Sequence, residues 1–199
     1  MANKSSICGL KPIEQPYGTV RTHYYHAATG IALYKYMPVD LDANGRVVVA
    51  TFASNNLLVG SIVGLYDGGY GPTDSDYSYV PANPVGYGSA GLVTVVVADD
   101  PGQFFVIEED TGGTALTAVA GGAGGSITLT ATTGSTLSGF CNAVLDRSIV
   151  DTGSNHQLRL IRKLDKPDND YGNYCKWIVS IALHRYHPSV PESARGSFI

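Results

Sequence analysis

Apolar residues along the chain occur in short runs that alternate with polar positions and are separated by glycine, proline and asparagine. Alternation with a period of two indicates half-buried β-strands, and turn residues between such runs favour antiparallel connections. Roughly nine to eleven short strands are therefore predicted, as in a sandwich or closed barrel. The predicted fold is all-β, an antiparallel β-sandwich or jelly-roll-like barrel. Its strands are expected within residues 31–41, 46–52, 57–66, 77–80, 92–98, 103–109, 127–132, 157–163 and 174–184.

Two turn motifs lie between these runs. Asn44-Gly45 is the dipeptide of tight hairpin turns in which both central residues need a positive φ. In Pro101-Gly102, the proline presets φ for the first turn position and the glycine suits the positive φ of a type II turn. We therefore predict one β-hairpin centred on Asn44-Gly45, and a second that joins residues 92–98 to 103–109.

The first 22 residues differ from the rest because they are polar and interrupted by proline. The isolated apolar residues Ile7, Leu10 and Ile13 show no period, so we predict an extended N-terminal arm without strand partners that adds almost nothing to the core. Long Gly/Tyr-rich loops are predicted within residues 67–91, and 137–145 is the one stretch expected to hold a helical turn. The predicted organisation is an arm at 1–22, a β-body at 23–187 and a C-terminal tail at 188–199.

Charge and cysteine content exclude several classes of function. Only 15% of the 199 residues are charged, the formal net charge is -4, and the 13 Lys and Arg residues are scattered, whereas duplex binding needs clustered cations. No apolar run approaches the ~18 residues of a membrane span, and no export signal is visible. We expect a soluble protein with no nucleic-acid or membrane partner, and reduced thiols at Cys8, Cys141 and Cys175 in a cytoplasmic setting.

Motifs for cofactors and metals are incomplete. Residues 86–91 match G-x-G-x-x-G but lack the strand and helix that dinucleotide binding needs. Residues 40–45 match the start of a calcium loop, but Thr51 stands where the closing Glu belongs, so the hairpin turn is the better interpretation. We expect no cofactor and no metal. The five histidines are expected at the surface or at an interface: His23, His26, His156, His184 and His187.

Acidic residues near two strand ends could in principle form an acid/base pair of the glycosidase kind. Turns and strand ends are ordinary places for a solvated acid, so we expect no catalytic residue among Asp99, Asp100, Glu108, Glu109 and Asp110.

Tyrosine is the more informative residue type, since it supplies a large contact area with a polar tip at protein interfaces and sugar sites. Partly exposed tyrosines that only cover barrel ends are the alternative. We expect the partner contacts at Arg21, Tyr24, Tyr25 and Tyr34.

An ordered series of short motifs spans most of residues 9–187. It comprises Gly9-Leu-Lys-Pro-Ile13, Pro38-Val-Asp-Leu-Asp-Ala-Asn-Gly45, Gly60-Ser-Ile-Val-Gly64-Leu-Tyr66, Tyr79-Val-Pro-Ala82, Val97-Ala-Asp-Asp-Pro101 with Phe105-Val-Ile-Glu108, Thr133-Gly-Ser135 with Leu137-Ser-Gly139, Leu158-Arg-Leu-Ile161 and Pro167-Asp-Asn169. With these motifs the chain resembles the capsid cement or decoration proteins of tailed double-stranded-DNA bacteriophages.

The resemblance implies a non-enzymatic protein on the outer surface of the icosahedral head of a virion, assembled in the host cytoplasm. It also implies a homotrimer that bridges neighbouring subunits of the major capsid protein. The residues themselves leave open a carbohydrate- or receptor-binding β-sandwich module of a phage tail or surface protein.

Overall fold

The structure, a computed structural model, describes residues 3–13, 18–28, 30–52, 56–67, 77–82, 93–151 and 156–187. These ranges hold thirteen strands and one short 3-10 helix, and every pair of neighbouring strands is antiparallel. The all-β prediction is therefore confirmed. The elements are β1 Lys11–Ile13, β2 Thr22–His26, β3 Leu33–Tyr34, β4 Pro38–Leu41, β5 Val47–Val49, β6 Gly60–Asp67, β7 Tyr79–Val80, β8 Val93–Ala98, β9 Phe104–Glu108, η1 Ala118–Ala120, β10 Gly124–Gly134, β11 Cys141–Asp151, β12 Leu158–Lys163 and β13 Lys176–Ile181.

The first half of the chain forms a five-stranded barrel. Its sheet has the order β2-β8-β6-β4-β5, and a parallel bridge between Ala27 and Val47 joins the two ends of that order. The Ala28 N–H donates to the Val47 carbonyl at 2.9 Å, and this bond closes the barrel just beyond β2. The two-stranded ladder of β3 and β7 is a separate small sheet.

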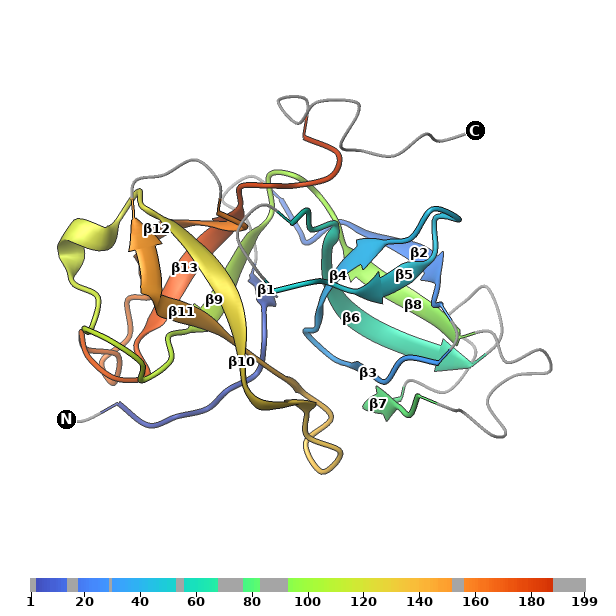
Figure 1. The fold of residues 1–199 in the computed structure, drawn as a ribbon, viewed down its shortest axis with the longest axis horizontal. Coiled ribbons are helices and arrows are strands. Elements are labelled where there is room, and N and C mark those ends of the chain that lie inside the picture. The colour runs from blue at the N-terminus through green and yellow to red at the C-terminus, as the bar shows by residue number, and fades with distance from the viewer. Residues whose placement is uncertain are drawn as a thin grey trace.

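The second half forms another five-stranded barrel, with the order β9-β13-β12-β10-β11. A parallel bridge between Glu109 and Leu145 closes it, and the Asp110 N–H donates to the Leu145 carbonyl at 3.0 Å. Strand β1 adds to the outer side of β9 as a sixth strand. Figure 1 shows the two groups of strands side by side, with β1 between them.

The two barrels repeat one another. If the strands of each barrel are numbered in chain order, both have the order 1-5-4-2-3 and both close through a parallel bridge between strands 3 and 1. The registers also repeat. His26 pairs with Thr94 in the first barrel and Glu108 pairs with Lys176 in the second, so each residue of the second pair is 82 positions after its counterpart in the first. The single bulge in each fourth strand matches too, at Val63 in β6 and at Ile161 in β12. The chain is therefore a tandem of two barrels with one topology.

The N-terminal segment contributes to the core, contrary to the prediction that it adds almost nothing to it. Lys11–Ile13 form β1 and pair with β9 of the second barrel. Leu10 is fully buried, its N–H donates to the Tyr36 carbonyl at 2.8 Å, and its carbonyl accepts from the Ser61 hydroxyl at 2.5 Å, both in the first barrel. The prediction failed because an isolated apolar residue has no visible period when its partners lie elsewhere in the chain. Thr22, which the predicted boundary assigned to the arm, is the first residue of β2.

The hairpin at Asn44-Gly45 is confirmed, with different turn geometry from that predicted. Strands β4 and β5 pair from Leu41↔Val47 onward, and the Asp42 N–H donates to the Arg46 carbonyl across a three-residue loop. Only Gly45 has a positive φ, 72°, so the turn is the three-residue type with one left-handed residue.

The second predicted hairpin is wrong, although its turn exists. The Gln103 N–H donates to the Asp100 carbonyl at 2.9 Å, and Gly102 is outside the positive-φ region that a type II turn needs. The flanking strands do not pair, because β8 lies between β2 and β6 while β9 lies between β1 and β13. The turn therefore connects the two barrels.

Two smaller expectations can also be compared with the structure. Residues 141–145, which were expected to hold a helical turn, lie in β11. The strand expected near residues 77–80 is β7. Most of the predicted loop at 67–91 and the tail at 188–199 lie outside the described residues.

Several contacts fix one barrel against the other. The Leu58 N–H donates to the Leu183 carbonyl, and the Arg185 N–H donates to the Leu58 carbonyl at 2.8 Å. The Arg185 guanidinium also holds both carboxylate oxygens of Asp40, at 2.6 and 2.5 Å. The buried apolar residues of the two barrels form one continuous core. The tandem is thus held as one unit.

Candidate interaction surface

An open hollow of about 450 Å³ lies where the start of β2 meets the turn between the barrels. We call it the β2 hollow. It is lined by Arg21, His23, Tyr25, Asp99, Asp100, Pro101 and Tyr186. Two of the predicted contact residues, Arg21 and Tyr25, therefore lie in the same depression, together with a C-terminal tyrosine that the sequence analysis did not single out.

The buried Asp99 side chain binds two of the residues that line the hollow. This side chain is almost fully buried, and Asp99 directly follows β8, the strand that pairs with β2. His23 and Tyr25 are two residues apart on β2 and so face the same side. His23 donates from Nδ1 to one Asp99 oxygen at 2.7 Å, and the Tyr25 hydroxyl donates to the other at 2.5 Å. The buried carboxylate is thus bonded through both of its oxygens.

Tyr25 is held in the hollow as a neutral phenol. Burial, followed by the hydrogen bond to Asp99, raises the pKa of Tyr25 far above its ordinary value. The Tyr25 and Tyr186 hydroxyl oxygens lie 3.3 Å apart, and the Tyr186 ring lies against His184 with centroids 5.8 Å apart. His184 is fully buried, and burial lowers the pKa of its imidazole. The rim therefore offers phenol groups over a fixed polar base.

Arg21 is at the solvent edge of the hollow. Its side chain is 79% exposed, and its Nε is 3.7 Å from Asp100, which makes a weak surface pair. Tyr24 points to the other face of β2 and is 47% exposed. Tyr34 is buried, contrary to its expected role, because its ring stacks on Tyr79 at 5.7 Å between centroids.

The chemistry of the β2 hollow suits binding. The exposed guanidinium of Arg21 provides donors, and Tyr25 and Tyr186 provide apolar faces with polar tips. Among the described residues that line it, the carboxylates are the doubly bonded Asp99 and the Arg21-paired Asp100.

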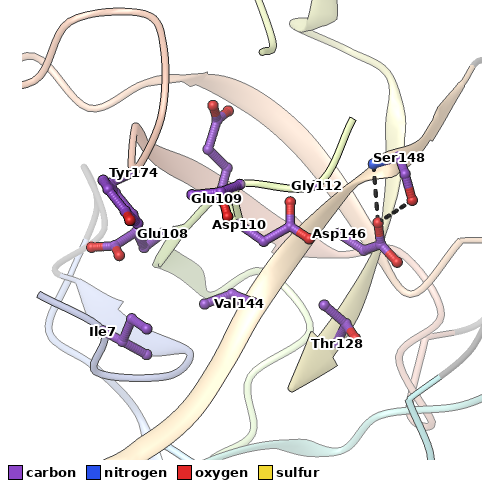
Figure 2. A pocket seen from close by; sticks show the side chains of 11 residues that line it. Ile7, Glu108, Glu109, Asp110, Gly112, Thr128, Val144, Asp146, Ser148 and Tyr174 are labelled. Carbon is purple, nitrogen blue, oxygen red and sulfur yellow. Dashed lines mark hydrogen bonds between the residues drawn. The ribbon is translucent and has the colours of Figure 1, made fainter. Parts of the chain in front are cut away.

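A second cavity, of about 330 Å³, is lined by three of the five acidic residues considered for catalysis, Glu108, Glu109 and Asp110 (Figure 2). Glu108 accepts from the Ser5 hydroxyl and the Ser6 N–H, both at 2.8 Å, so it anchors the N-terminal segment. Asp146 accepts from the N–H and hydroxyl of Ser148 at 3.0 and 2.5 Å. Figure 2 shows the Glu109 carboxylate pointing away from that of Asp110. Burial, to which the nearby charge of Asp146 adds, raises the pKa of Asp110, and the Asp110 carboxylate accepts from the Arg147 N–H at 3.4 Å.

Glu109 and Arg147 form a buried structural pair beside this cavity. Glu109 accepts from the Trp177 indole at 2.9 Å and from Arg147 at 3.4 Å, and burial raises its pKa. The Arg147 guanidinium also donates to the carbonyls of Thr111 and Gly112 at 2.7 and 2.5 Å. Its donors therefore hold the loop after β9 in place.

The remaining candidate groups serve the fold. Asp42 accepts from the N–H groups of Asn44 and Arg46, which lower its pKa, while Asp40 binds Arg185, so the calcium-like motif is a hairpin turn. Within the described ranges, no group of three or more His, Cys, Asp and Glu residues is placed to hold a metal ion. The three cysteines are free, and burial raises the pKa of both Cys141 and Cys175 to about 12.

Comparisons with known proteins give no relative: no family model, curated protein or solved structure matches the chain. Among the residues that the structure describes, none of the helical segments is long and apolar enough to cross a membrane.

Proposed function

We propose that the chain is a non-enzymatic structural protein of a virion that binds the outer surface of an icosahedral head and cements neighbouring subunits of the major capsid protein. The ordered motifs of residues 9–187 support this proposal through their resemblance to phage decoration proteins. On this proposal, the protein is assembled onto the head in the host cytoplasm, and it has no direct nucleic-acid or membrane partner.

The observation that carries the proposal is the rigid tandem of two equivalent barrels. A cement protein has to transmit force between two neighbours, so its two contact regions must not move independently. Here the Asp40–Arg185 pair, the Leu58 backbone bonds and the buried Leu10 join the barrels through a common core. Two linked contacts of modest strength also bind far more tightly than one alone. A homotrimer would extend the same principle to threefold positions on a shell.

Attachment is assigned to the surface around β2, with Tyr24, Tyr25 and Arg21 as its anchors. Interface hot spots are enriched in Tyr and Arg, and truncating one typically costs ~2 kcal/mol or more, whereas an exposed ion pair gives ~1 kcal/mol or less. Aromatic burial should therefore outweigh charge in holding the protein on the head.

The test is decoration of bare heads of the virus that encodes the chain, measured as bound copies per head. The wild type should bind at a fixed stoichiometry, and Tyr24→Ala should weaken binding by about tenfold or more. Tyr171→Ala is the matched control, because Tyr171 is also 47% exposed and lies in the loop before β13. Heads that do not bind the wild type would overturn the proposal, and equal loss with both variants would remove Tyr24 as an anchor.

A second candidate function is binding of a carbohydrate or receptor, as in a phage tail protein. The observation that favours it is the β2 hollow, since tyrosine faces beside fixed polar groups are typical of sugar sites. A glycan array separates the two functions, because a cement protein should leave every glycan unbound while it decorates heads.

A further inference from the structure

The two barrels differ in what lies on the outer edge of their first strand. In the second barrel, β9 pairs with β13 on one side and with β1 on the other. The pairs on the β1 side are Lys11↔Val106, Pro12↔Phe105 and Ile13↔Phe104. By the repeated register, residues 104–106 correspond to residues 22–24 of β2 in the first barrel.

Backbone bonds at the end of β2 show which groups face this edge. The Ala27 N–H donates to the Val93 carbonyl of β8, whereas the Ala28 N–H donates away from β8, to Val47. Successive residues of a strand direct their N–H and C=O groups to opposite sides. Thr22 and Tyr24 therefore direct theirs outward. The same parity in β9 turns Phe104 and Val106 toward β1 and leaves Pro12 opposite Phe105, where no N–H is needed.

The outer edge of β2 is open in the described part of the chain. No described strand pairs with Thr22–Tyr24 on this side, and the barrel closes only beyond them, at Ala27. Natural edge strands are usually protected by proline, lysine or a bulge. Residues 22–26 have none of these, and they keep a regular register with β8. An unprotected edge of this kind is a template for a further strand.

We propose that the edge at Thr22–Tyr24 binds an extended segment of a second protein, antiparallel to β2, in the position that β1 has on β9. The inference rests on the proposed function, and its partner is the head protein that the chain cements. The segment has an acidic side chain beside Arg21, whose side chain is 79% exposed. The 3.7 Å pair of Arg21 with Asp100 is weak enough to be exchanged for it.

A second copy of this chain fits the edge less well. Among the described segments of that copy, β1 is the one that pairs with the outer edge of a first strand, and it already pairs with β9 of its own chain. Moving it would expose the fully buried Leu10 and break the bonds that Leu10 makes with Tyr36 and Ser61. The occupant is therefore a different protein.

The first test is amide hydrogen exchange on the isolated protein. The outward N–H groups of Thr22 and Tyr24 should exchange rapidly, whereas those of Phe104 and Val106 should be protected by β1. Equal protection in a monomer would overturn the inference, because the chain would cover its own edge. Protection that appears only with self-association, measured by sedimentation, would overturn it as well, since the occupant would be a second copy.

The second test separates the backbone from the side chain on bare heads. Tyr24→Pro removes the outward N–H and the phenol, whereas Tyr24→Ala removes the phenol alone; proline is tolerated on a strand edge that faces solvent. Tyr24→Pro should bind at least tenfold more weakly than Tyr24→Ala, with an unchanged unfolding midpoint. Heads that bind both variants equally would overturn this inference alone, whereas heads that do not bind the wild type would overturn the proposed function.

Discussion

Leu10→Ala is the sharpest test of the N-terminal segment as part of the core. In an arm that adds nothing to the core, Leu10 would be exposed to solvent, but in the structure it is fully buried in the continuous core. The substitution leaves the main chain unchanged, so the bonds of residue 10 to Tyr36 and Ser61 can remain. The measured effect is then the loss of the buried side chain itself.

The expected loss follows from burial. Replacing Leu by Ala removes about three carbon groups at ~0.8 kcal/mol each, and the remaining cavity adds to this, so the free energy of unfolding should fall by about 3 kcal/mol. For a chain of this length, that corresponds to a decrease of about 6 to 12 °C in the midpoint of thermal unfolding.

The assay is urea unfolding followed by tryptophan fluorescence, since Trp177 is fully buried in the second barrel. The midpoint should fall without a change in slope, because the same surface is exposed on unfolding. Leu137→Ala is the matched control: Leu137 is 98% exposed, and the change should stay within about 0.5 kcal/mol. Equal stability of Leu10→Ala and Leu137→Ala would refute the reasoning and restore the prediction that the arm adds almost nothing to the core.

Three further predictions follow from the structure. Gly60→Ala should destabilise by about 2 kcal/mol or more, because a Cβ there would lie 2.0 Å from a carbonyl oxygen of β8, whereas Gly18→Ala has open space and should be nearly neutral by urea unfolding; equal midpoints would contradict this. Tyr25→Phe should cost about 2 kcal/mol in the same assay, since the buried Asp99 carboxylate loses a donor, and an unchanged midpoint would show that this bond adds nothing. Burial lowers the pKa of His184 in the folded state, so its contribution to the free energy of unfolding is fully present above the unfolded pKa of about 6.5 and is lost as the pH falls below that value. His184→Gln should therefore show a flatter dependence of melting temperature on pH between pH 8 and 5 than the wild type. Parallel pH profiles of the two proteins would show that His184 is not the cause.

Local patterns determined the elements of this protein but not their partners. The period-two alternation and the turn dipeptides predicted an all-β fold and the hairpin at Asn44-Gly45, because a short turn fixes which strands it joins. The same reasoning failed at Pro101-Gly102, where β8 and β9 already have neighbours on both sides. Sequence reasoning also missed the repeat of the two barrels. Two segments can share strand order and register without sharing residues, because each position has only to stay buried or exposed.

The β2 hollow, too, was predictable only in part from the sequence. Composition determined that aromatic contacts near residues 21–25 were the best candidates for binding, because Tyr and Arg are suited to interfaces whatever the fold. The tertiary structure alone decided that Tyr34 is buried, that Tyr186 joins Tyr25, and that Asp99 lies beneath His23, 76 residues away. Burial and pairing of this kind depend on which strands close each barrel, and no local pattern records a contact between residues so far apart in the chain.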